Sequence, residues 1–67
     1  MMMTEKQQRY IRNLIPVVIS ERRIKPDDAL AIFSQLFFGR KPDEMSVGDG
    51  KAAIEILLQA RSSLYFK

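Results

Sequence analysis

The sequence predicts an all-α fold, a small bundle of about three helices that is completed by dimerisation. Apolar side chains recur at helical spacing in three segments, and these segments begin and end at typical capping residues. The chain has 67 residues, and a domain of this size buries only about 60% of its unfolded surface. It contains no cysteine and no histidine, so disulfides and the usual zinc sites cannot add stability, and association is the remaining route.

The first helix is expected to begin after Thr4, because Thr4 and Gln7 have the spacing of a capping box. Apolar residues then follow at helical spacing: Tyr10, Ile11, Leu14, Ile15 and Val18. Pro16 lacks an N–H and clashes with the carbonyl four residues back, so we expect the helix to be kinked or broken there. Val18 keeps the helical phase, which favours a helix; an edge strand over residues 17–20 is the alternative.

The second helix is predicted over residues 26–38. Pro26 suits the first helical position, Gly39 suits a left-handed C-cap, and Pro42 prevents continuation. Acidic residues follow Pro26 and basic residues follow Gly39, as the helix dipole favours. At about 100° per residue, six apolar residues share an arc of about 160°, which we expect to face the core: Ala29, Leu30, Ile32, Phe33, Leu36 and Phe37.

Residues 39–50 contain three glycines and a proline and are predicted to form a flexible loop within a single domain, residues 1–67. Asp49 is then expected to cap a third helix that runs to about Tyr65. This helix has one apolar stripe: Ala53, Ile56, Leu57, Ala60 and Leu64. A second stripe has three residues: Ile54, Leu58 and Tyr65. A helix that is apolar on two sides is either the middle helix of the bundle or shared with a partner.

Phe38 lies outside the apolar arc of the second helix. It either packs under the following loop, on Met45 or Val47, or belongs to a protein–protein contact together with the second stripe of the third helix. Aromatic side chains and arginine are enriched at such contacts. The predicted partner-binding residues are therefore Phe38, Ile54, Leu58, Arg61 and Tyr65.

The residue types present argue against catalysis. Without histidine or cysteine the chain lacks the usual base and nucleophile at neutral pH, so we expect a non-enzymatic protein with no catalytic residues, no metal and no cofactor. The longest apolar run, "LIPVVI", is far shorter than the roughly 20 residues of a membrane span. The start, "MMMTEKQQRY", has no apolar signal region. We therefore expect a cytoplasmic protein that binds no membrane.

Two basic clusters provide an alternative function. The formal net charge is +3, and the basic residues that could contact phosphates flank the second helix: Arg22, Arg23, Lys25, Arg40 and Lys41. A helix-turn-helix is not favoured, because the motif joins its helices by about three or four residues and the predicted loop is longer. Charged side chains are also common at the solvent-exposed ends of helices, where they interact with the helix dipole without binding a nucleic acid.

The segment "ERRIKPDDALAIF", residues 21–33, resembles the small AraC-negative-regulator family. Glu21-Arg22, Ala29, Phe33 and Arg61 carry the resemblance, which covers about half of the chain. It implies a small cytoplasmic bacterial protein that binds a transcription activator and lowers its activity without enzymatic chemistry. The sequence thus predicts a small regulatory protein that acts by protein–protein binding as a homodimer, with direct DNA binding as the alternative.

Overall fold

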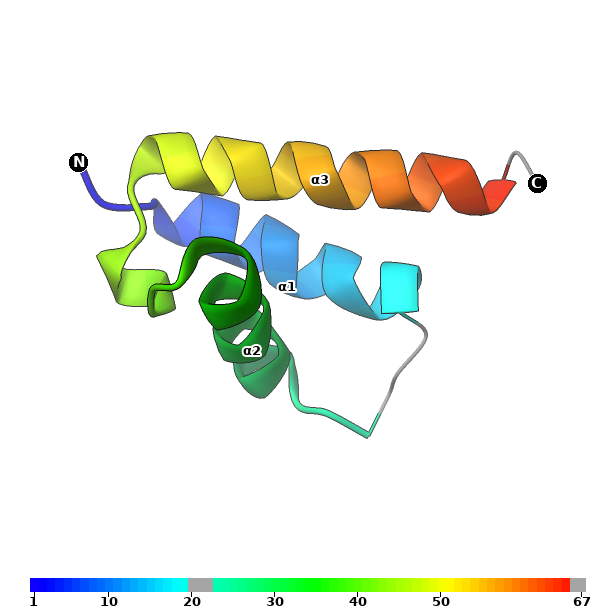
Figure 1. Cartoon of the computed structure of the whole chain (residues 1–67). Helices are drawn as coiled ribbons and strands as arrows, with labels where there is room; N and C mark the ends of the chain where they lie inside the picture. The colour runs from blue at the N-terminus through cyan, green and yellow to red at the C-terminus, as the bar shows by residue number, and fades with distance from the viewer. Residues whose placement is uncertain (20–22, 66–67) are drawn as a thin grey trace.

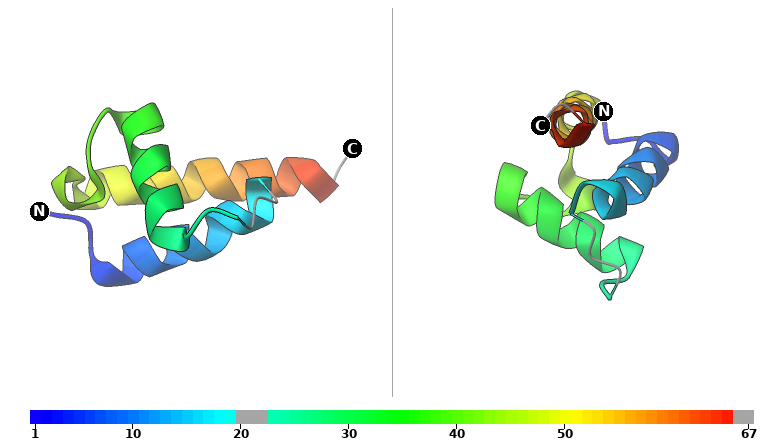
Figure 2. Two further views of the ribbon diagram at one scale, coloured as in Figure 1. Left: turned by 90° about the horizontal axis from the view of Figure 1, so that it is seen from below. Right: turned by 90° about the vertical axis from the view of Figure 1, so that its right-hand side faces the viewer.

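The computed structural model describes residues 1–19 and 23–65, the side chains of Leu64 and Tyr65 excepted. This part of the chain contains α1 (Glu5–Ile19), α2 (Pro26–Phe38), the 3₁₀ turn η1 (Pro42–Glu44) and α3 (Val47–Tyr65), and it has no strand. The prediction of a small three-helix, all-α bundle is confirmed. α3 runs alongside α1, whereas α2 crosses α1 (Figures 1 and 2). The middle helix is therefore α1, and the interpretation of α3 as the middle helix is wrong.

α1 begins at the predicted capping box. The Gln7 N–H donates to Thr4 Oγ1 over 3.1 Å, and the Thr4 N–H donates to Gln7 Oε1 over 3.0 Å. The helix continues through Pro16 to Ile19, so it is not broken, and the alternative of a strand is wrong for residues 17–19. Ser20 lies outside the described residues. The apolar face continues across the proline, since Ile15 before it is buried and Val18 after it packs against the core. This packing holds the helix together where Pro16 cannot make its hydrogen bond.

α2 has the predicted bounds. Lys25 is extended (φ −65°, ψ 146°), as the residue before a proline should be. Gly39 adopts the left-handed conformation with φ 64°, and its N–H donates to the Gln35 carbonyl over 3.0 Å. A side chain at this position would strain the backbone.

α3 begins at Val47, two residues before the predicted cap, so the loop is shorter than expected. The Asp49 N–H donates to Ser46 Oγ over 3.0 Å, and the Ser46 N–H donates to Asp49 Oδ2 over 3.1 Å. Ser46 is therefore the cap, and Asp49 is the reciprocal partner three residues later. The N-terminal residues hold the segment before α3 in place. The Met3 N–H donates to the Met45 carbonyl over 2.7 Å, and the Met45 side chain is fully buried.

The core joins all three helices to the N-terminal segment. Its buried apolar residues are Met3, Ile11, Leu14, Ile15, Ala29, Leu30, Phe33, Met45, Ala53 and Leu57. α3 can approach the start of α1 because residue 50 is glycine. A Cβ on Gly50 would lie 2.9 Å from the Gln7 side chain and from Met3 Cγ. Gln7 in turn donates from Nε2 to the Val47 carbonyl over 3.2 Å, which fixes the two helix starts together.

Candidate protein-binding groove

The outer face of α2 carries three large apolar side chains that the sequence places in the core. Ile32, Leu36 and Phe37 are 50%, 76% and 58% exposed, so their predicted core placement is wrong. α2 buries only three residues of the apolar arc, together with a serine: Ala29, Leu30, Phe33 and Ser34. The serine tolerates burial because its hydroxyl donates to the Ala31 carbonyl over 3.0 Å.

These side chains line a groove between α2 and the end of α1, which we call the α2 groove. Its lining residues are Ile15, Ile19, Ile24, Ala29, Ile32, Phe33, Leu36 and Phe37. It has a volume of about 150 Å³, and its lining is almost wholly apolar. Ile15, Ala29 and Phe33 belong to the core, so the groove is a continuation of the core that opens to solvent.

The three phenylalanines of α2 divide between the groove and the core. The Phe37 ring stacks on the Phe33 ring, with 4.6 Å between their centroids, and its outer side faces solvent. The Phe38 ring is partly buried, packs against the core and meets Phe33 edge-on at 6.2 Å. Phe38 thus packs against the core beside Phe33, and its predicted contact with a partner stays a prediction. Phe37 is the ring with an open face.

The predicted partner-binding residues do not form one free surface. Ile54 and Leu58 are partly buried and pack against the core, as Phe38 does. Arg61 is exposed, and the Tyr65 side chain lies outside the described residues. The Ile54 and Leu58 side chains of the second stripe of α3 therefore flank the core, whereas Leu36 and Phe37 of α2 are among the most exposed large apolar side chains of the helices.

Sequence reasoning missed Ile19 and Ile24 as groove residues. Ile19 follows the last apolar residue named for the first helix, and Ile24 precedes the second helix, so neither residue was placed on an apolar face. The sequence did contain a signal for exposed apolar surface on α2. Its apolar arc of about 160° is wider than the roughly 100° stripe that a helix usually packs against one core.

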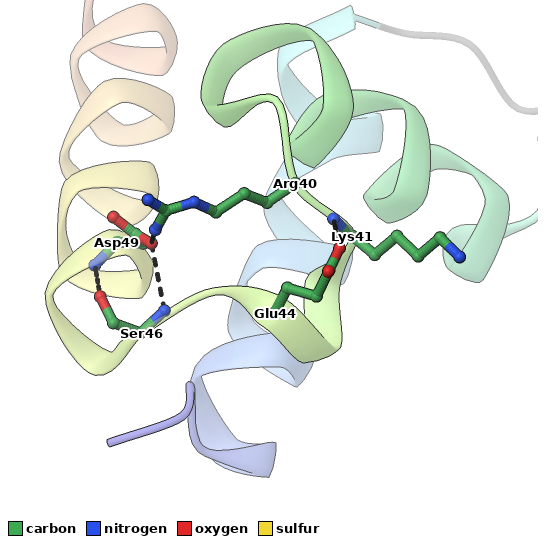
Figure 3. Close-up of polar contacts among 5 residues, drawn as sticks. All are labelled: Arg40, Lys41, Glu44, Ser46 and Asp49. Atoms are coloured by element: carbon green, nitrogen blue, oxygen red, sulfur yellow. Dashed lines mark hydrogen bonds and ion pairs between the residues drawn. The ribbon is translucent and has the colours of Figure 1, made fainter.

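The basic clusters lie at opposite ends of α2. Arg23 and Lys25 are exposed before it, whereas Arg22 lies outside the described residues. At the other end, Arg40 Nη1 lies 2.8 Å from Asp49 Oδ2, and Figure 3 shows the two side chains pointing toward one another. The Lys41 side chain is exposed.

At the start of α3, Asp49 makes hydrogen bonds with both Ser46 and Arg40 (Figure 3). The hydrogen bond from the Ser46 backbone N–H is the largest cause that lowers the pKa of the Asp49 carboxyl, and Arg40 lowers it further against the effect of desolvation. Each of these groups is used in capping α3 or in joining it to the end of α2. The cluster is thus explained by its structural role.

The described residues offer no group of three or more acidic side chains that could hold a metal ion. Among the described helices, none is both long and apolar enough to cross a bilayer. No family model, curated protein or solved structure matches this chain. The interpretation of function therefore depends on the α2 groove and on the residue types that line it.

Proposed function

We propose that this chain is a small non-enzymatic regulatory protein that acts by binding another protein at the α2 groove. The observation that carries the proposal is the exposure of Ile32, Leu36 and Phe37 beside an almost wholly apolar groove. Contiguous exposed apolar surface on a small protein marks an interaction site. The open Phe37 ring beside the groove is the kind of anchor that dominates binding at such sites.

The resemblance to the AraC-negative regulators suggests that the partner is a bacterial transcription regulator. Of the residues that carry it, Ala29 and Phe33 are buried in the core and line the groove floor, whereas Arg61 is exposed on α3. In this proposal Ala29 and Phe33 shape the groove, and the exposed side chains beside them contact the partner.

Direct DNA binding fits the surface less well. The exposed middle of α2, between the two basic clusters, is apolar, and DNA offers phosphates and polar base edges there. Arg40 is already paired with Asp49. Binding through several phosphates must weaken steeply as salt rises, so a titration of a DNA duplex across salt concentrations tests this alternative. We expect no binding at low salt; tight, steeply salt-dependent binding would contradict the proposal.

Affinity capture from the native host tests the proposal with a matched pair of variants. Leu36→Glu places a charge in the groove at an exposed position, and Gln59→Glu places the same charge on the exposed side of α3. We expect the wild type and Gln59→Glu to retain a common protein that Leu36→Glu loses. Retention of the same proteins by all three chains, or of none, would refute binding at this groove.

A further inference from the structure

We infer that the last turn of α1, residues 17–19, is a movable wall of the α2 groove that opens while the rest of the bundle stays folded. We call this segment the hinged turn, and Pro16 is its hinge. The inference rests on the proposed function, since it takes the groove as the binding surface and concerns how a side chain of the partner enters it. α1 provides two groove residues, Ile15 and Ile19, and Pro16 lies between them in the chain.

The part of α1 before Pro16 is fixed to the bundle. Leu14 and Ile15 are buried in the core, and a close-packed core does not let them move independently. Arg12 also joins α1 to the start of α2, since Arg12 Nη1 lies 3.5 Å from Asp27 Oδ1. Ile15 therefore belongs to the fixed floor of the groove.

The hinged turn is held more weakly. In an α-helix the N–H of residue 16 would donate to the Arg12 carbonyl, but proline has no N–H and its ring crowds that carbonyl. Val17 and Ile19 are 46% and 52% exposed, and Val18 is only partly buried where it packs against the core. The last turn of α1 also contains no basic residue that would interact with the negative end of the helix dipole. Local opening of residues 17–19 therefore requires less free energy than unfolding of the bundle.

The α2 side of the groove is rigid by comparison. Pro26 and Gly39 fix the two ends of α2 through their backbone angles. Ala29 and Phe33 hold its middle in the core. The width of the groove therefore changes mainly through the hinged turn, which carries Ile19.

Opening of the hinged turn changes the size of side chain that the groove accepts. With the turn helical, the groove has a volume of about 150 Å³, which suits one aromatic ring. Displacement of Ile19 widens the groove, while Ile15, Ala29 and Phe33 remain as its floor. The helical turn is the form that the free chain adopts, so the open form is a minor state that sets how fast a partner side chain enters and leaves.

Amide hydrogen exchange of the free protein, followed residue by residue by NMR, tests the hinge. We expect the amides of residues 17–19 to exchange at least about tenfold faster than those of Ile11 and Leu14, at a rate that low urea leaves unchanged. Pro16→Ala restores the missing donor and should slow the exchange of residues 17–19 at least about tenfold. Exchange of all these amides in one urea-dependent step, or no effect of Pro16→Ala, would overturn the inference.

Asn13→Ala is the matched control, because it changes an exposed residue of the same helix and restores no hydrogen bond. It raises helix propensity and should slow the exchange of the hinged turn by no more than about threefold. An effect as large as that of Pro16→Ala would show that the turn frays as any helix end does, and it would contradict a hinge at Pro16.

Thiol labelling tests whether opening of the turn reaches the groove, since the chain has no cysteine of its own. Ala29→Cys places a thiol on the groove floor, and Ala53→Cys places one in the core on α3. At low urea we expect an aromatic disulfide reagent to label Ala29→Cys at least about tenfold faster than Ala53→Cys. Adding Pro16→Ala should slow the labelling of Ala29→Cys by about tenfold. Labelling that Pro16→Ala leaves unchanged would separate the groove from the turn and remove the inference.

The two proposals fail separately. A hinged turn that behaves as described, in a chain that captures no protein from the native host, leaves the hinge intact and removes the proposed function. A captured protein that Leu36→Glu loses, in a chain whose residues 17–19 open only with the whole bundle, leaves the proposed function intact and removes the hinge.

Discussion

Truncation of the adjacent rings Phe37 and Phe38 to alanine separates the core side of α2 from its binding side. Phe37 is 58% exposed. A phenylalanine with roughly 200 Å² of surface then hides only about 80 Å², worth at most about 2 kcal/mol at about 25 cal/mol per Å². Alanine keeps part of this burial, so we expect Phe37→Ala to lower the free energy of unfolding of the monomer by about 1 kcal/mol.

Phe38→Ala should cost more, although its ring has the same size. The Phe38 ring packs against the buried cluster and meets Phe33 edge-on, so its removal leaves a cavity as well as losing apolar burial. We expect a loss of about 2–4 kcal/mol. A domain of 67 residues has a total stability of about 3–10 kcal/mol, so this loss removes a large part of it.

Urea unfolding followed by far-ultraviolet circular dichroism measures both effects. At low protein concentration, where self-association would add no apparent stability by mass action, the two variants report the stability of the single chain. A loss at low concentration that is as large for Phe37→Ala as for Phe38→Ala would show that Phe37 is a core residue and refute the assignment of the groove.

The remaining predictions concern the start of α3. Gly50→Ala should lower the free energy of unfolding by about 1–3 kcal/mol, because its Cβ would displace the hydrogen-bonded Gln7 side chain. Gly48→Ala is the matched control, because its Cβ would meet only Ser46 Oγ, at 3.6 Å. Thermal or urea unfolding should show that this variant raises the free energy of unfolding by about 0.5–1 kcal/mol. Equal effects of the two substitutions would contradict the close approach at Gly50. Because the pKa of Asp49 is lowered in the folded chain, the unfolded chain takes up its proton more readily, and the stabilisation is present above the ordinary aspartate pKa and lost as pH falls below about 4. Asp49→Asn should therefore flatten the acid limb of a stability–pH profile, and an unchanged acid limb would exclude this role.

Local signals in the sequence were sufficient for α2 and for the start of α1. Pro26 and Gly39 fix the two ends of α2 through backbone angles that depend on only a few neighbouring residues. The reciprocal hydrogen bonds of Thr4 and Gln7 are equally local. Such elements can be predicted because no distant part of the chain has to be placed first.

The start of α3 could have been predicted from a signal of the same kind. Ser46 and Asp49 have capping-box spacing, but Asp49 by itself is also a good N-cap, and its choice shifted the expected cap by three residues. The shift mattered because it lengthened the predicted loop and hid the role of Met45, which is a core residue.

The division of the α2 arc could not be predicted from α2 itself. Both halves of the arc are apolar, and the helix period places Phe37 within it and Phe38 outside it. The position of α1 decides which half is buried, and that position depends on the packing of the whole bundle. In the structure Ser34 is buried and Phe38 packs against the core, whereas Ile32 and Leu36 at the other end of the arc are exposed. Phe37 lies between Phe33 and Leu30 around the helix, so its exposure could not be read from the helix period.

The residue types on the outer half of α2 are themselves the argument for a second contact. Leu36 is 76% exposed and contributes little to the core, so a glutamine there would leave the monomer as stable and make its surface more polar. Ile32 is 50% exposed, so half of its side chain is likewise open to solvent. The exposed parts of both side chains add nothing to the stability of the monomer, and both side chains line an apolar hollow. A contact made outside the single chain explains both residues and the hollow together.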